Sequence, residues 1–292
     1  MSRLSIEKQS QPGRAGALNN RAITRVMSFT SGKGGVGKTN TVLNLAIALA
    51  REGRRVLVFD ADLGLANLDV LLGLRVEHTL HDVLEGRRSM QEIMVDGPEG
   101  IRLIPASSGV ESICNLNASQ RLQLLSSIEE VASQFDYLLI DTGAGIGAEV
   151  MYFNSASSEI VCVINGEPTS LTDAYAMIKI LSRNYGEKSI SILVNNVSRE
   201  QEADLAFKRL AKSVDRFLQV QLKYLGFIPY DISISDAVRE QRALLDIYPS
   251  SSAGRAFVHL ARRVDEDFWD MRVKGGMQFF FKQILEANSS GF

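Results

Sequence analysis

A glycine-rich segment near the amino end of the chain carries a complete phosphate-binding pattern. Residues 31–39 read Ser-Gly-Lys-Gly-Gly-Val-Gly-Lys-Thr, which matches G-x-x-x-x-G-K-[ST] from Gly32 to Thr39. Glycines let the backbone approach phosphate oxygens, and the N–H groups of the loop and of the helix behind it bind the anion. In this pattern Lys38 reaches the β- and γ-phosphates and the Thr39 hydroxyl binds Mg²⁺. The segment therefore predicts a nucleoside triphosphate site.

The same glycines also fit G-x-G-x-x-G, the pattern of dinucleotide-binding loops. Asp60 follows at about the distance along the chain where such sites place a ribose-binding acid. A dinucleotide-dependent oxidoreductase is therefore an alternative function. A dinucleotide loop has no use for a lysine and a hydroxyl directly after its last glycine, whereas a triphosphate with Mg²⁺ needs both. The Lys-Thr pair that ends the segment favours the triphosphate.

Acidic residues end two of the expected strands. Asp141 ends the apolar run 137–141, where it can hold Mg²⁺ directly or through water, or else cap the next turn. Asp60 and Asp62 stand at the end of another run, and residues 63–73 after them are expected to form an ordered but mobile loop. An acid near the γ-phosphate can orient the attacking water or accept its proton. We predict this role for Asp62, with helix capping as the alternative.

The elements that must position these residues follow an alternating pattern. Short runs rich in Val, Ile and Leu occupy 23–30, 56–60, 101–105, 137–141, 160–165, 190–195 and 224–229. Helical patterns lie between most of them, over 38–52, 118–134, 170–186 and 200–217. Continuous apolar strands are typical of a parallel sheet covered on both faces. The sequence predicts an α/β fold with a doubly wound, mostly parallel sheet and ligand sites at the carboxyl ends of its strands.

Composition excludes several other classes of protein. The chain has 292 residues, of which 45% are hydrophobic and 23% charged, enough for one large core without disulfides. Its net charge of -2 argues against general nucleic-acid binding. The two cysteines, Cys114 and Cys162, lie far apart and suggest a reducing, cytoplasmic setting, with Cys162 as a buried thiol. No secretory signal or membrane-spanning run is expected.

Several segments together resemble the MinD/ParA class of dimerising ATPases. The loop has an additional lysine, Lys33, five residues before Lys38, as in the deviant phosphate loop of that class. Residues 60–69 (DADLGLANLD) and 141–146 (DTGAGI) resemble its two switches, and 226–231 (GFIPYD) resembles its adenine-side strand end. The resemblance covers about 24–270 and implies a P-loop NTPase fold that binds ATP and Mg²⁺ and hydrolyses ATP to ADP and phosphate.

The resemblance also implies roles for individual residues. Lys33 would cross an ATP-bound homodimer to the partner's phosphates, and it counts with Lys38 and Asp62 as catalytic. The implied metal-binding residues are Thr39, Asp62 and Asp141. The implied nucleotide contacts are Gly32, Lys33, Gly34, Gly35, Val36, Gly37, Lys38, Thr39, Asn40, Glu167, Asn195, Pro229 and Asp231.

Four of these contacts lie far from the glycine-rich segment in sequence. Glu167 would contact the ribose in the partner's site. Asn195 would read the purine, with a strand-to-helix turn as the alternative explanation for this asparagine. Pro229 and Asp231 would flank the base.

Within the class, residues 167–179 (EPTSLTDAYAMIK) are similar to the flagellar number regulators FlhG, also called FleN or YlxH. Cell-division MinD, or another cargo-positioning ATPase of the class, is the alternative. The partners that this branch implies are FlhF, the switch proteins FliM and FliN, and a FleQ-like transcription regulator, without direct nucleic-acid binding. Many FlhG proteins act on the GTPase FlhF through an amino-terminal D-Q-A-x-x-L-R segment. Residues 7–18 lack it, so the resemblance gives no ground for GTPase activation here.

The end of the sequence has the pattern of an amphipathic helix. Over 277–285, Met, Phe, Phe, Ile and Leu recur at helical spacing on one face, after a Gly-Gly pair and two nearby cations. We predict that this helix binds an anionic membrane surface, with core packing or partner docking as alternatives. The expected organisation is a flexible segment over 1–22, an ATPase domain over 23–272 and the membrane helix within 273–292. The protein is expected to be cytoplasmic and peripheral on the inner face of the membrane.

Overall fold

A computed structural model of the chain describes residues 24–62, 68–105 and 117–270. The predicted flexible segment 1–22 and the predicted membrane helix in 273–292 lie outside these residues, as do Cys114 and residues 63–67 of the first switch. Cys162 is described and buried, and its burial raises the pKa of the thiol to about 12.

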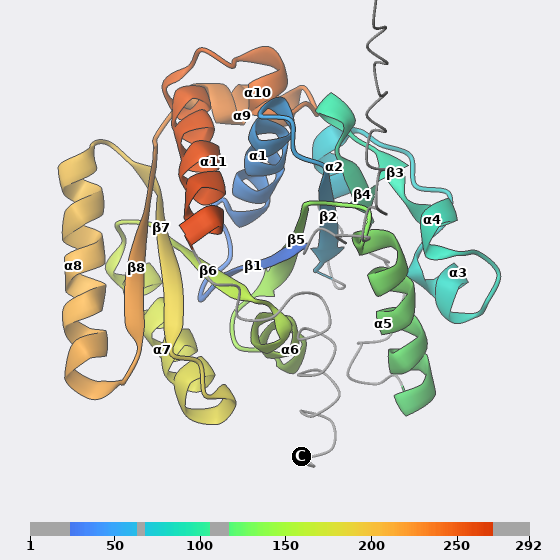
Figure 1. The fold of residues 1–292 in the computed structure, drawn as a ribbon. Coiled ribbons are helices and arrows are strands. Elements are labelled where there is room, and N and C mark those ends of the chain that lie inside the picture. Colours follow the sequence, from blue (N-terminus) through green and yellow to red (C-terminus); the bar gives the residue numbers. More distant parts are fainter. Residues whose placement is uncertain (1–23, 63–67, 106–116, 271–292) are drawn as a thin grey trace, which may run out of the picture.

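The described residues contain a single eight-stranded sheet with the order β3-β4-β2-β5-β1-β6-β7-β8 (Figure 1). The strands are β1 (Arg25–Ser31), β2 (Val56–Ala61), β3 (Val95–Asp96), β4 (Arg102–Ile104), β5 (Tyr137–Ala144), β6 (Glu159–Ile164), β7 (Ser189–Val197) and β8 (Gln221–Pro229). Every neighbouring pair is parallel except β3 with β4. This confirms the predicted doubly wound, mostly parallel sheet. Each predicted apolar run overlaps a strand, and among the described strands only the two-residue β3 was not predicted.

Helices connect the strands and cover the sheet. They are α1 (Lys38–Arg51), α2 (Leu68–Leu72), α3 (Leu80–Leu84), α4 (Met90–Ile93), the 3₁₀ turn η1 (Pro98–Gly100), α5 (Ala118–Ala132), α6 (Ala148–Ala156), α7 (Pro168–Tyr185), α8 (Glu200–Phe217), α9 (Ile232–Arg239), α10 (Leu244–Ile247) and α11 (Ser252–Asp270). The prediction of a loop over 63–73 was wrong for its second half, where α2 forms. Leu68 is buried in the core, and its N–H donates to the Asp60 carboxylate at 3.2 Å, so the start of α2 is anchored.

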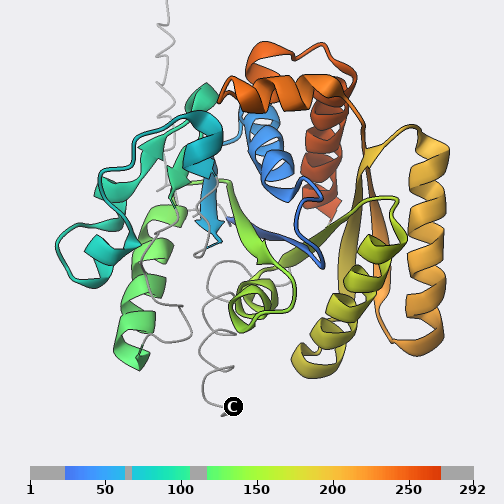
Figure 2. The ribbon, with the colours of Figure 1, turned by 180° about the vertical axis from the view of Figure 1, so that it is seen from behind.

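Alternate residues of the central strands face two separate cores. Met27 and Phe29 of β1 pack in the core under α1 and α11, whereas Val26 packs on the opposite side of the sheet. That opposite side is covered by α5 and α6 beneath β2 and β5, and by α7 and α8 beneath β6 and β7 (Figures 1 and 2). Both faces of the sheet are therefore covered by helices and buried from solvent, which explains why its strands are continuously apolar.

The central strands bring three functional segments to one edge of the sheet. β1 lies between β5 and β6, and β2 pairs with β5 on the other side. In this register Asp141 lies beside Phe29 of β1 and beside Asp60 of β2. The glycine-rich segment after β1 and the acids in the carboxyl-terminal parts of β2 and β5 therefore lie together at one edge of the sheet. No helix in the described residues is long and apolar enough to cross a membrane.

Candidate functional site

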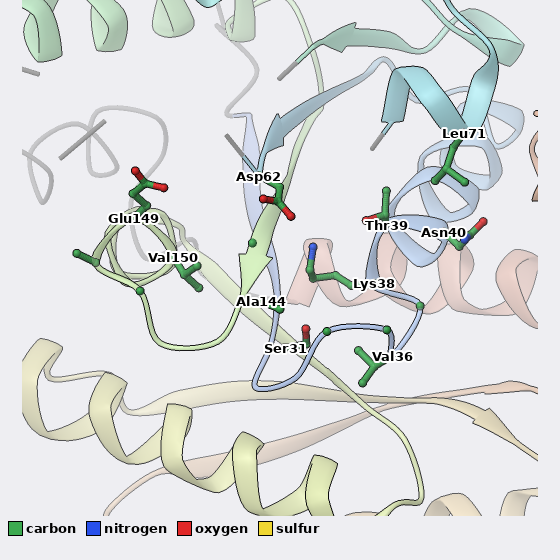
Figure 3. A pocket seen from close by; sticks show the side chains of 16 residues that line it. Ser31, Val36, Lys38, Thr39, Asn40, Asp62, Leu71, Ala144, Glu149 and Val150 are labelled. Atoms are coloured by element: carbon green, nitrogen blue, oxygen red, sulfur yellow. The ribbon is translucent and has the colours of Figure 1, made fainter. Parts of the chain in front are cut away.

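A cavity of about 790 Å³ opens where these strands end (Figure 3). Its walls come from the glycine-rich segment, the start of α1, the end of β2, α2 and the turn into α6. The lining residues are Ser31, Gly34, Gly35, Val36, Gly37, Lys38, Thr39, Asn40, Asp62, Leu71, Gly143, Ala144, Gly147, Ala148, Glu149 and Val150. The structure thus gathers most of the predicted phosphate-site residues around one space.

The turn into α1 has the geometry of an anion-binding helix start. Gly37 precedes α1 with φ 85° and ψ 25°, in the left-handed region that favours glycine. No side chain caps this end of the helix, and its first turn contains no acidic residue. The first N–H groups of a helix lack partners within the helix, and they carry its positive dipole end. The start of α1 can therefore bind a phosphate group.

Gly32 lies outside the cavity lining, and it is needed for a different reason. A Cβ atom at this position would lie 2.3 Å from the carbonyl carbon of Asp173 in α7. Only glycine permits this approach, so Gly32 fixes the loop against α7. The predicted phosphate contact through Gly32 stays a prediction.

Lys38 and Asp141 form a buried ion pair at the floor of the cavity. The Lys38 ammonium donates to Oδ1 of Asp141, and the two side chains are 8% and 0% exposed. Burial raises the pKa of Asp141, while Lys38 and the Thr39 hydroxyl lower it part of the way back. Oδ2 of Asp141 is buried without a hydrogen-bond partner in the described residues. This oxygen is available to a water or ion beside Thr39.

Asp60 and Asp62 have different surroundings although only one residue separates them. The fully buried Asp60 carboxylate accepts the N–H groups of Asp62 and Leu68, both at 3.2 Å, so it organises the turn after β2. Asp62 is half-buried and lines the cavity, and its side chain points toward that of Lys38 (Figure 3). The ribose-binding role that the dinucleotide alternative would give Asp60 is excluded, because its carboxylate is enclosed.

Lys33 points away from the cavity of its own chain. Its ammonium lies 2.7 Å from Oε2 of Glu167 and 3.3 Å from the Thr169 hydroxyl, at the start of α7. Lys33 lowers the pKa of Glu167. Neither Lys33 nor Glu167 lines the cavity. Their predicted contacts across a dimer concern a second chain and stay predictions.

Asn195 supports the glycine-rich segment from β7. Its Nδ2 donates to the Val36 carbonyl at 2.7 Å, and a Cβ atom at Gly37 would collide with it at 2.3 Å. Its Oδ1 is buried without a hydrogen-bond partner in the described residues. The structure therefore shows that Asn195 supports the loop through its Nδ2 atom. Its purine-reading role stays a prediction, for which Oδ1 is the atom without a partner in the described residues.

Pro229 and Asp231 lie at the end of β8, outside the cavity lining. The Asp231 carboxylate accepts the Ser233 N–H that opens α9, and the Ser252 hydroxyl and Ala253 N–H that open α11. Burial alone would raise the pKa of Asp231, but these hydrogen bonds lower it. Asp231 therefore joins two helix ends, and the base-flanking role of both residues stays a prediction.

Several cavity residues on α2 and at the start of α6 were not predicted from the sequence: Leu71, Gly147, Ala148, Glu149 and Val150. Glu149, in the first turn of α6, is the second carboxylate in the lining after Asp62, and Leu71 of α2 closes the other side. The only signal for Glu149 was its place directly after the second switch. Leu71 could not be identified, because its segment was expected to be a loop.

The residues around the cavity fit a nucleoside triphosphate with Mg²⁺. The start of α1 and the Lys38 ammonium supply positive charge for phosphates. The unpaired Oδ2 of Asp141 and the Thr39 hydroxyl are oxygen ligands of the kind that Mg²⁺ prefers. In the described residues, no group of three or more His, Cys, Asp or Glu side chains is placed to hold a metal. Mg²⁺ at nucleotide sites is bound through few protein ligands together with substrate phosphates and waters.

Comparisons with known proteins agree with this geometry. Residues 27–245 match the CobQ/CobB/MinD/ParA nucleotide binding domain. The antiactivator FleN of Pseudomonas aeruginosa is 44% identical over 267 residues, which cover 91% of this chain and 95% of FleN. The flagellum site-determining protein YlxH of Helicobacter pylori is 36% identical over 274 residues, which cover 92% of each chain.

Solved structures show the same fold. The septum site-determining protein MinD of Pyrococcus horikoshii, complexed with Mg-ADP, superposes with a TM-score of 0.65 and 28% identity, over 84% of this chain and 97% of that one. The resemblance inferred from the glycine-rich segment and the two switches is thereby confirmed. The chain belongs to the CobQ/CobB/MinD/ParA nucleotide-binding family, as an ATPase of the MinD/ParA class.

Proposed function

We propose that this ATPase regulates the number and placement of flagella. The observation that carries the proposal is the 44% identity to FleN over 91% of the chain, with YlxH of Helicobacter pylori as a second flagellar relative. ATP with Mg²⁺ is the proposed cofactor, since the cavity fits it and the related MinD of Pyrococcus horikoshii is complexed with Mg-ADP.

The described residues support direct attack of water on the γ-phosphate. The N–H groups at the start of α1 bind and orient the phosphates. Lys38, held at the cavity floor by Asp141, places a positive charge where negative charge develops in the transition state. Mg²⁺ would neutralise further phosphate charge, with Thr39 and Asp141 holding it. Asp62 orients the attacking water and accepts its proton.

Two steps of the proposal involve a second molecule. Lys33, which is 41% exposed on the outside of the loop, crosses to the partner's phosphates in an ATP-bound homodimer. Glu167 contacts the partner's ribose in the same dimer. The helix predicted over 277–285 attaches the protein reversibly to an anionic membrane surface. One such helix binds weakly, whereas two in a dimer bind together at high effective concentration.

The proposed cycle follows from these steps. An ATP-bound dimer resides on the inner face of the cell membrane, and hydrolysis returns the protein to the cytoplasm as a monomer. The partners that we propose to test first are FlhF, the switch proteins FliM and FliN, and a FleQ-like regulator. Direct nucleic-acid binding is not part of the proposal, because the chain has a net charge of -2.

Flagellar counts in a strain that lacks this protein test the proposal. Electron micrographs are scored for flagella per cell and for minicells in the same fields, with a complemented strain as the control. Excess or misplaced flagella with normal septa are the expected result. Normal flagella would contradict the flagellar proposal.

Division-site selection is the second candidate function. It is favoured by relatives such as the septum site-determining protein MinD of Synechocystis, 33% identical over 83% of this chain. Minicells together with normal flagella would support it. Normal flagella together with normal septa would indicate that this ATPase positions a different cargo.

A further inference from the structure

A second cavity, of about 400 Å³, lies along β8 between α8 and α11. β8 is the last strand of the sheet, and α11 runs beside it (Figures 1 and 2). Most of the lining belongs to β8 and α11, with Glu200 at the start of α8 as the contribution of the third element. Lys33, Lys38 and Asp62 do not line this cavity, which we call the edge groove.

The edge groove exposes backbone that the sheet does not use. In the described residues, β8 pairs only with β7. Arg263 of α11 donates to the Tyr224 carbonyl at 2.9 Å, so this carbonyl already has a partner and an added strand would have to displace that contact. Unpaired N–H and C=O groups of an edge strand can accept an additional strand from another protein.

The charges on the groove wall have a regular spacing. Arg255, His259 and Arg263 of α11 line the groove and are exposed. They follow one another at four-residue intervals, which corresponds to roughly 6 Å along a helix. Alternate side chains of an extended chain recur every 6.5–7 Å or so on the same face. Acidic side chains at alternate positions of a strand laid beside β8 would therefore each meet one of these residues.

The other wall of the groove is formed by aromatic side chains of β8 and by the exposed carboxylate of Glu200 at the start of α8, so an acidic side chain on this side would be repelled. Tyr224 and Phe227 of β8 are partly buried on the face of the sheet that α8 covers, whereas α11 packs on the opposite face. Tyr224 contributes a buried hydroxyl that has no hydrogen-bond partner in the described residues. The side chains of an added strand would alternate between these two faces. Acidic residues would face α11, and apolar or hydroxyl-bearing residues would face Tyr224 and Phe227.

We propose that the edge groove binds an extended acidic segment of a partner protein as an additional edge strand. Acidic side chains at alternate positions pair with Arg255, His259 and Arg263, and the side chains between them pack toward Tyr224 and Phe227. No residue lines both this groove and the phosphate cavity, although Pro229, which is predicted to flank the base, lies at one end of the groove. The inference goes beyond the proposed function and does not depend on it.

Binding of two labelled peptides tests this proposal. The first peptide alternates glutamate with valine or threonine, and the second has the same composition with all its glutamates in one block. Fluorescence anisotropy with the full chain, without nucleotide and at physiological ionic strength, measures both affinities. We expect the alternating peptide to bind at least about tenfold more tightly, because only it matches the spacing along α11. A benzophenone group at one apolar position should cross-link to β8 or α11.

A charge-reversal pair provides the matched control. His259→Glu should weaken binding of the alternating peptide by roughly fivefold or more, because it places a repelling charge in the groove. Lys212→Glu, which replaces an exposed cation of α8 that does not line the groove, changes the net charge by at least as much and should alter binding by less than about twofold. If His259→Glu fails to fold by circular dichroism, Arg255→Glu takes its place.

Three outcomes would overturn the proposal. The first is absence of saturable binding by the alternating peptide. The second is equal affinity for the two peptides, which would show attraction by net charge alone. The third is an equal loss of affinity in His259→Glu and Lys212→Glu.

Discussion

The Lys33 ammonium is held 2.7 Å from the Glu167 carboxylate at the start of α7, on the rim of the phosphate loop. Both side chains are well exposed, at 41% and 57%. Ion pairs this exposed stabilise a fold by only about 0–1 kcal/mol. The contact therefore places Lys33 on the outer surface while leaving it easy to release. A lysine that must cross to a second molecule needs both properties.

Asp62 is expected to be required for hydrolysis and dispensable for nucleotide binding. Asp62→Asn removes the carboxylate that accepts a proton from water, and kcat should fall by roughly 10²–10⁴-fold. The affinity for a fluorescent ATP analogue should change little, because the start of α1 and Lys38 bind the phosphates. Single-turnover hydrolysis and equilibrium titration measure the two effects separately.

Glu149→Gln is the matched control for Asp62→Asn, because Glu149 is the other carboxylate in the cavity lining. It should retain most of the hydrolysis rate. A large loss of rate in Glu149→Gln with normal turnover in Asp62→Asn would assign the proton acceptor to α6 and contradict the role given to Asp62.

Asp231 is expected to stabilise the fold by an amount that depends on pH. Asp231→Ala leaves three donors from α9 and α11 without their acceptor, which should cost about 1–3 kcal/mol in the free energy of unfolding at neutral pH. The folded-state pKa of Asp231 lies below its ordinary value of 3.8. This stabilisation is therefore complete above that value and is lost as pH falls below it.

Urea unfolding of both proteins across the acidic range measures this dependence. The difference between wild type and Asp231→Ala should be largest near neutral pH and should shrink below pH 3.8. Asp236→Ala is the control, because Asp236 forms an exposed pair with Arg239 of the same helix. A difference that grows as the solution is acidified would contradict the account.

The helix predicted over 277–285 is expected to be required for membrane binding but not for ATP hydrolysis. Truncation after Gly276 removes the apolar face over 277–285, so ATP hydrolysis should persist while co-sedimentation with anionic vesicles is lost. Phe281→Glu should act in the same direction, because it places a charge on the apolar face. Gln283→Glu, on the other face, is its control. Unchanged vesicle binding by the truncated protein would refute the assignment.

The phosphate site could be predicted from sequence because its information is local. The glycine-rich segment, Lys38 and Thr39 lie within nine consecutive residues, and the strand and helix around them have clear patterns. Asp141 could be placed as well, since it directly follows the apolar run that forms the first part of β5, although the strand continues to Ala144. The pairing of β1 with β5 then brings Asp141 to the loop.

Contacts between distant segments could not be predicted in the same way. The hydrogen bond from Asn195 to Val36 joins residues 159 positions apart, and it depends on how the end of β7 lies against the loop. The three donors to Asp231 depend on where α9 and α11 begin after β8. The edge groove arises only because α11 returns to pack beside β8, and the apolar periodicity of either element does not report that pairing.

Sedimentation velocity of Lys33→Ala with saturating ATP and Mg²⁺ tests the central claim, that ATP at the phosphate loop assembles a dimer. Lys179→Ala, which removes an exposed lysine of α7 outside the cavity, is the matched control. The account predicts an ATP-dependent dimer for wild type and Lys179→Ala, and a monomer that still binds ATP for Lys33→Ala. Equal dimer in all three proteins, or no dimer in any of them, would contradict it.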